Sequence, residues 1–151
     1  MVAALCKELI MRKEEALGSE LQTIYLGGGT PSILTYDELK QLFDTIYSYY
    51  KVSPTAEITI ECNPDDFFRL HTPEQLLQQL TSLGINRLSL GVQSFFEEDL
   101  RLMNRVHTTT QVTTLLPIAS QYFDNITIDL IYGIPMMSNE RWKENIYKTL
   151  S

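Results

Sequence analysis

The sequence predicts an α/β fold in which four strands of one parallel sheet alternate with helices. Two observations support this class. Helical and strand patterns alternate along the chain, which is typical of βαβ units. Each strand pattern also ends in polar or glycine-rich residues, and the carboxyl ends of parallel strands meet at one ligand site. The expected strands are Thr23–Gly29, Glu57–Asn63, Arg87–Gln93 and Asn125–Gly133.

Local signals place the helices between these strands. The first pattern is amphipathic and covers 1–18. Capping boxes begin the next two helices, at Thr35 with Glu38 and at Thr72 with Gln75, and Gly84 is expected to stop the second of them. Both boxes satisfy backbone N–H groups that a helix start leaves unpaired.

The last two helical patterns are less regular. Thr108–Tyr122 contains Pro117, which is expected to kink this helix or to shift its start. The final pattern begins at Ser138 and runs to the end of the sequence. Because the first pattern also lacks an N-cap residue, we expect residues 1–151 to be a single domain cut from a larger protein.

Composition narrows the class of protein. Hydrophobic residues make up 44% and charged residues 21%, which is ordinary for a globular chain. Twelve basic and nineteen acidic residues give 12 − 19 = −7, which argues against nucleic-acid and anionic membrane surfaces. No apolar run reaches the roughly 20 residues of a membrane span, and the pattern over 1–18 carries charges throughout, so we do not expect it to be a signal peptide. Cys6 and Cys62 lack metal-site spacing and are expected to be reduced thiols of a cytoplasmic protein.

Alternation within the strands indicates that one face of the sheet is polar. Parallel strands covered on both faces are usually apolar throughout. Here Ile58, Ile60 and Cys62 point to one face, and Glu57, Thr59 and Glu61 point to the other. Unpaired burial of such carboxylates is costly. The polar face is therefore expected to line a solvated or ligand-filled cavity of an open, partial barrel.

The glycine run after the first strand is a candidate binding loop. Gly28 and Gly29 allow backbone N–H groups to approach a ligand, and Thr30 adds a hydroxyl. The run is either a nest for a carboxylate, an amine or a phosphate, or simply a tight turn. No Gly-Lys-Ser/Thr follows it, so it is not a P-loop.

Polar residues at the other strand ends are further candidates. Glu61 can accept two ribose hydroxyls, or it can pair with an Arg or Ser of a neighbouring strand. Asp129 interrupts an apolar strand, which favours a functional role. Gln93 either contacts a ligand or belongs to a capping segment with Ser94 as the cap. Arg105 is either a cationic partner for a carboxylate or a solvated surface residue.

No nucleophile and base occur together, and neither His71 nor His107 carries a signal for heme ligation. A polar cavity without a reactive side chain suggests that a cofactor supplies the reactivity. These residues together resemble the oxygen-independent coproporphyrinogen III oxidase-like family of the radical S-adenosylmethionine (SAM) superfamily. The resemblance rests on five segments in the order of the family: Tyr25–Ser32, Glu61–Pro64, Gly84–Phe95, Asn104–Arg105 and Asp124–Pro135.

The resemblance implies a partial (β/α)6 barrel of TIM type that holds SAM against a 4Fe–4S cluster. It implies that Gly28, Gly29 and Thr30 hold the methionine end of SAM and that Glu61 holds the ribose. It also implies that Gln93, Arg105 and Asp129 complete the SAM shell.

One departure from the family concerns the cluster. The chain lacks the Cys-x-x-x-Cys-x-x-Cys loop, which is expected upstream of Met1, so this piece alone is expected to be inactive. It is then the middle of a radical SAM core, and its first strand becomes an unpaired edge that favours self-association.

Three functions remain open. The segments containing Gln93 and Arg105 resemble the heme-chaperone branch, whose client is heme, more than the true oxidase branch. That branch gives the first function, a heme chaperone. The second function is that of a true oxidase that decarboxylates coproporphyrinogen III propionates. The third is a non-enzymatic module that binds a small anion.

Overall fold

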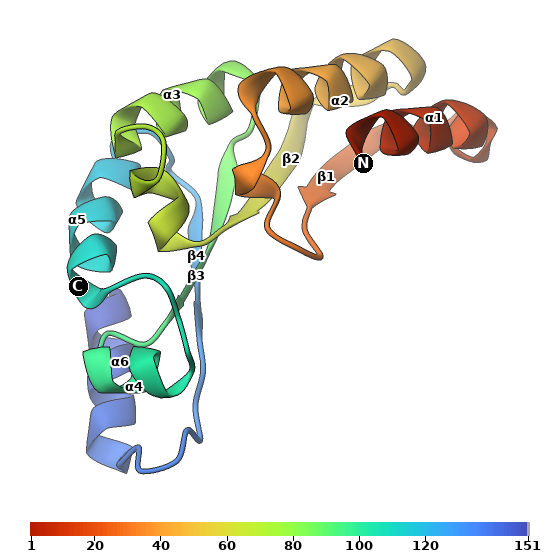
Figure 1. The fold of residues 1–151 in the computed structure, drawn as a ribbon. Helices are drawn as coiled ribbons and strands as arrows, with labels where there is room; N and C mark the ends of the chain where they lie inside the picture. Colours follow the sequence, from red (N-terminus) through yellow and green to blue (C-terminus); the bar gives the residue numbers. More distant parts are fainter. Residues whose placement is uncertain (151) are drawn as a thin grey trace.

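A computed structural model, which describes residues 1–150, contains one parallel sheet with its strands in chain order (Figure 1). Every neighbouring pair of strands is parallel, which confirms the predicted α/β class. The strands are β1 (Leu21–Leu26), β2 (Val52–Cys62), β3 (Arg87–Gln93) and β4 (Ile126–Leu130). The α-helices are α1 (Val2–Arg12), α2 (Tyr36–Tyr49), α3 (Pro73–Ser82), α4 (Glu97–Leu102), α5 (Thr109–Ala119) and α6 (Asn139–Leu150).

The predicted capping boxes begin α2 and α3. Thr35 Oγ1 accepts a hydrogen bond from the Glu38 N–H at 3.3 Å, and Glu38 Oε2 accepts one from the Thr35 N–H at 2.9 Å. Thr72 and Gln75 repeat this arrangement before α3. Gly84 then turns the chain with a φ of +87°, as expected for a residue that stops a helix.

Two helical predictions are wrong in detail. The first helix ends at Arg12 and continues as a 3-10 turn over Lys13–Ala16, because Gly18, at a φ of +79°, then redirects the chain into β1. The shifted start expected for α5 is also wrong. This helix begins after a Thr108 cap and runs unbroken through Pro117. Pro117 lies near the end of the helix. It has no N–H to donate to the Thr113 carbonyl one turn earlier, and both residues are exposed.

The helix α4 is absent from the sequence prediction. Six residues are too few to show a helical period, which needs a window of about 11 residues. Ser94 is not the cap of this helix, since Phe96 occupies that position. The Ser94 hydroxyl instead donates to Asp99 at 2.7 Å.

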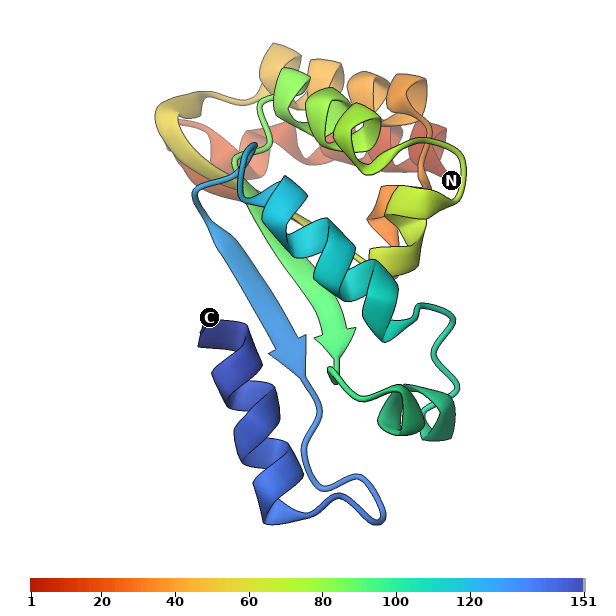
Figure 2. The same cartoon turned by 90° about the vertical axis from the view of Figure 1, so that its left-hand side faces the viewer.

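The core lies between the apolar face of the sheet and the helices α2, α3 and α5. Ile60, Leu88 and Leu77 are fully buried there, and burial of each such side chain is worth roughly 1.5–3 kcal/mol. Figures 1 and 2 show these helices on one side of the sheet, with α5 lying across β3 and β4. Within residues 1–150, no helix covers the other face, as the strand alternation predicts.

The uncovered face is only partly open to solvent. Glu61 is half-buried and Asp129 is exposed, whereas Thr59 and Ser89 on the same face are buried. No helix among residues 1–150 is long and apolar enough to cross a bilayer.

Candidate functional site

The glycine turn after β1 wraps around the carboxylate of Glu61 at the end of β2. Gly28 has a φ of +82°, and its N–H donates to Glu61 Oε2 at 3.1 Å. A Cβ on Gly27 would lie 2.7 Å from Glu61 Cδ and 2.7 Å from the Tyr25 ring. Glycine at position 27 is therefore what lets the turn approach the carboxylate.

Tyr25 is the second partner of Glu61, and sequence reasoning did not single it out as a site residue. Its hydroxyl donates to Glu61 Oε1 at 2.8 Å. The bond to Glu61 and partial desolvation raise the pKa of Tyr25, the Ser89 hydroxyl lowers it, and the charges of Glu61 and Asp129 raise it further. The period-two pattern of β1 could have identified this residue, because it places an aromatic side chain on the polar face.

Each Glu61 oxygen therefore has one protein donor. A carboxylate has about four acceptor positions, so roughly two stay open to a ligand. The alternative that Glu61 pairs with an Arg or Ser of a neighbouring strand does not hold, since its hydrogen-bond partners among the described residues are Tyr25 and Gly28. The acceptor positions that remain open suit a diol.

Gln93, at the end of β3, lies near Asn63 at the end of β2. Asn63 Nδ2 donates to Thr30 Oγ1 at 3.5 Å, which links the first two strand ends. A Cβ on Gly91 would lie 2.8 Å from Gln93 Nε2 and 3.2 Å from Asn63 Oδ1. The missing side chain of Gly91 thus makes the space into which both amides project.

A buried carboxylate beneath the turn joins the first two loops. Asp66 Oδ2 accepts from Ser32 Oγ at 2.5 Å and from the Asn63 N–H at 3.0 Å. Ser32 follows the glycine turn and Asn63 follows β2. Asp66 therefore fixes the spacing between the loops that carry Thr30 and Glu61.

The remaining candidates are less closely connected. Asp129 is exposed on β4, and its charge acts on Tyr25. Gly29 has open space around it. Arg105 is exposed in the loop between α4 and α5, and no hydrogen bond or ion pair among residues 1–150 joins its side chain to Glu61, Gln93 or Asp129. The structure thus brings the strand-end residues together but leaves Arg105 apart from them.

The His107 side chain contacts other parts of the protein through both ring nitrogens. It is buried, its Nε2 lies 3.0 Å from the Val92 carbonyl oxygen, and its Nδ1 lies 3.8 Å from Asp65 Oδ1. The ring therefore ties the end of β3 to the turn after β2, and both nitrogens face protein atoms.

The two cysteines are free and buried. Burial raises the pKa of the Cys62 thiol far above its usual value, so it is not a thiolate at neutral pH. Within residues 1–150, no group of three or more His, Cys, Asp or Glu side chains has the geometry of a metal site.

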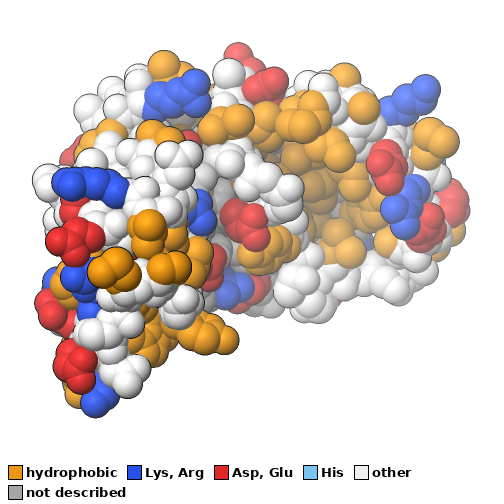
Figure 3. Space-filling model, turned by 60° about the horizontal axis from the view of Figure 1, so that its bottom comes forward, with side chains coloured by type: hydrophobic (Ala, Val, Ile, Leu, Met, Phe, Trp, Pro, Cys, Tyr) orange, Lys and Arg blue, Asp and Glu red, His pale blue; other side chains and the backbone are white. Residues whose placement is uncertain are grey.

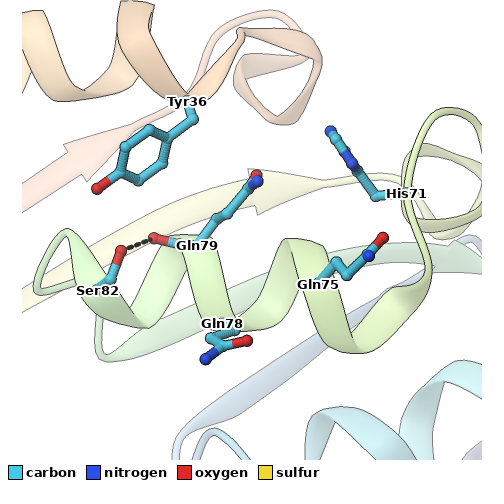
Figure 4. A pocket seen from close by; sticks show the side chains of 6 residues that line it. All are labelled: Tyr36, His71, Gln75, Gln78, Gln79 and Ser82. Carbon is cyan, nitrogen blue, oxygen red and sulfur yellow. Dashed lines mark hydrogen bonds between the residues drawn. The ribbon is translucent and has the colours of Figure 1, made fainter.

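An open groove of about 420 Å³ lies away from this site, on the helical side of the molecule (Figure 4). Its lining is polar and largely amide, and it contains none of the predicted site residues. The lining residues are Tyr36, His71, Gln75, Gln78, Gln79 and Ser82. The groove is separate from the strand ends at which a βα fold binds its ligand.

Comparisons with known proteins identify the family. Residues 4–146 match the sequence model of the Radical SAM superfamily. The heme chaperone HemW of Synechocystis is 35% identical over 99% of this chain and 35% of its own length. The oxygen-independent coproporphyrinogen III oxidase of Synechocystis is 32% identical over 85% of this chain and 27% of its own length.

A solved structure gives the same result. The coproporphyrinogen III oxidase HemN from Escherichia coli, a radical SAM enzyme, superposes with a TM-score of 0.85 at 32% identity. The match covers 98% of this chain and 33% of that chain, and this chain spans about a third of the length of the curated relatives it matches. The order of the strands, the glycine turn against Glu61 and the match over residues 4–146 agree, and the chain belongs to the radical SAM superfamily.

Proposed function

We propose that this chain is the SAM-binding part of a radical SAM protein of heme metabolism, of the heme-chaperone type. The observation that supports the proposal is the position of the Glu61 carboxylate at the carboxyl end of β2. The turn after β1 and the Tyr25 hydroxyl hold it there. Its open acceptor positions would take the two ribose hydroxyls of SAM.

The other strand-end residues would surround the rest of the cofactor. Gly28, Gly29 and Thr30 would hold the methionine end, and Gln93 and Asp129 would complete the shell from β3 and β4. Arg105 would have to approach from its exposed loop. Bound SAM supplies radical chemistry, whereas these residues bind and orient it.

The residues of this chain fit SAM but not the cluster. A 4Fe–4S cluster is held by cysteine thiolates, and both cysteines of this chain are buried on separate elements, Cys6 on α1 and Cys62 on β2. The proposal therefore includes a longer protein whose cluster loop lies outside these residues. Heme would be its client, and free thiols at Cys6 and Cys62 support a cytoplasmic location.

The alternative function is that of a true oxygen-independent coproporphyrinogen III oxidase. The superposition on the Escherichia coli oxidase favours it. Anaerobic assay of the full-length protein separates the two functions. The chaperone proposal expects heme binding without decarboxylation of coproporphyrinogen III, and the oxidase alternative expects carbon dioxide release.

The SAM site can be tested on this chain by titration calorimetry and by amide NMR. We expect one SAM to bind per chain, with the largest shifts at Gly28 and Gly29, and S-adenosylhomocysteine to compete. Binding of phosphate or acetate at this turn without SAM binding would instead favour a small-anion module. The full-length protein, reconstituted anaerobically, is expected to hold about four irons.

The free edge of β1 is the proposed route of self-association. In the part of the chain that the structure describes, this strand pairs with β2 on one side and has no partner on the other. Figure 3 shows hydrophobic side chains gathered on the side where β1 and α1 lie. Leu17, just before β1, and Tyr25, on β1, are both exposed. Exposed edges pair with other chains. We expect light scattering to give a mass that rises with concentration, and Gln22→Lys, at an exposed position of β1, to reduce it. A constant monomer mass would contradict this proposal.

A further inference from the structure

The turn that follows Gln93 is held by a residue far away in the sequence. Asn145 lies on α6 and is completely buried. Its Oδ1 accepts from the Phe95 N–H at 2.7 Å and lies 3.3 Å from Ser94 Oγ. Its Nδ2 has no hydrogen-bond partner among the described residues, so the acceptor oxygen is what connects this amide to the protein.

The turn needs such support because its backbone is strained. Gln93 has a φ of +67°, a conformation that L side chains rarely adopt and that costs of order 1–3 kcal/mol. Strained residues persist when the surrounding structure determines their conformation, and they concentrate at functional sites. Two backbone contacts support the turn on the strand side. The Ile131 N–H donates to the Gln93 carbonyl at 2.9 Å, and His107 lies against the Val92 carbonyl.

The helical side of the turn is supported by a polar cluster between α4 and α6. Ser94 donates to Asp99 at 2.7 Å, and Arg141 Nη1 lies 3.0 Å from Asp99 Oδ1. Asp99 is buried, and Arg141 also contacts Glu98 at 2.8 Å and lies over the Phe96 ring. The cluster thus fixes where α6 lies, while Asn145 itself reaches the backbone immediately after Gln93.

We infer that Asn145 is a positioning residue for Gln93, which it holds in the strained conformation that directs the Gln93 amide over Gly91 and into the SAM site. The inference rests on the proposed function in one respect, namely that Gln93 contacts SAM. Its structural part, that Asn145 determines the conformation of the turn, is independent of any ligand.

Two measurements on Asn145→Ala test the inference. The first is amide hydrogen exchange without ligand, followed by NMR. We expect the Phe95 N–H to be protected in the wild type and to exchange at least about tenfold faster in the variant, because its acceptor is lost. The Gln93 resonances are expected to move as well. Lys143→Ala, an exposed position on the same helix, is the control and should change neither.

The second measurement is a double-mutant cycle of SAM affinity. Asn145→Ala is expected to weaken SAM binding about tenfold in the wild-type background and less than about twofold in a Gln93→Ala background, because a residue that acts through Gln93 has no effect once its side chain is gone. An equal loss in both backgrounds would overturn the inference, as would unchanged Phe95 exchange. If Asn145→Ala does not fold, Asn145→Leu fills the volume without the acceptor. If the wild type fails to bind SAM, the proposed function fails, and the exchange measurement still decides the positioning role.

Discussion

Replacing Glu61 by Ala is expected to weaken SAM binding about 100-fold, which corresponds to about 2.7 kcal/mol at 25 °C. The proposed site assigns both ribose hydroxyls to this carboxylate, and hydrogen bonds to a charged group contribute about 1.5–3 kcal/mol each. The variant also loses the acceptor for the Gly28 N–H and the Tyr25 hydroxyl, so the turn and the ring lose their common contact. Titration calorimetry on the 151-residue chain measures the change.

Glu57→Ala is the matched control for this experiment. Glu57 lies on the same strand and the same face, and it also carries one negative charge. It is paired with Arg87 at 2.9 Å and lies in the middle of β2, opposite Thr23 and four residues before Glu61. Its removal is expected to change SAM affinity less than about twofold. Equal losses for the two variants would mean that the net charge of the face, and not the Glu61 site, determines the affinity.

Glu61→Gln distinguishes charge from shape at this position. A glutamine keeps one acceptor oxygen, and its amide group can donate to the Tyr25 oxygen. We therefore expect an affinity between those of the wild type and of Glu61→Ala. An affinity equal to that of the wild type would show that the ligand does not use the carboxylate as a double acceptor, and the ribose assignment would then be wrong.

The parts of this molecule that the sequence predicts well are those set by neighbouring residues. The boxes at Thr35 and Thr72 involve residues three apart, and each begins a helix as expected. The polar residue at each strand end follows from the period-two alternation, which also places Glu61 and Asp129 on one face. These features depend on residues that are close in the sequence, so contacts between distant residues do not change them.

The parts that the sequence does not predict depend on contacts between distant residues. In the sequence, Asn145 looks like an ordinary polar residue of an amphipathic helix. Its positioning role depends on its contact with Phe95, 50 residues earlier. The positive φ of Gln93 has no local signal, because it is imposed by α6, by His107 and by β4. Arg105 shows the opposite case. Its motif suggests a site residue, but its side chain is exposed apart from the others, so its role remains a proposal.

Replacing Asp66 by Ala is expected to lower the free energy of unfolding by about 2–4 kcal/mol. This carboxylate is buried, and it accepts the Ser32 hydroxyl and the Asn63 N–H with the same oxygen. Its loss leaves a buried hydroxyl and a half-buried N–H unpaired, and an unsatisfied buried donor costs about 1–3 kcal/mol. For a chain of this length the melting temperature should fall by roughly 4–16 °C, because 1 kcal/mol corresponds to about 2–4 °C. Thermal and urea unfolding measure the two quantities.

The position of Asp66 makes this loss a functional matter as well as a structural one. Ser32 belongs to the loop that carries Thr30, and Asn63 belongs to the strand end that carries Glu61, so the two sides of the proposed site meet at one carboxylate. Asp124→Ala, an exposed carboxylate in the loop before β4, is expected to cost less than about 0.5 kcal/mol. At a temperature where Asp66→Ala is still folded, it should also bind SAM more weakly than Asp124→Ala does. A stability like that of Asp124→Ala would show that water replaces the carboxylate, and the two loops would then be held together by their backbones alone.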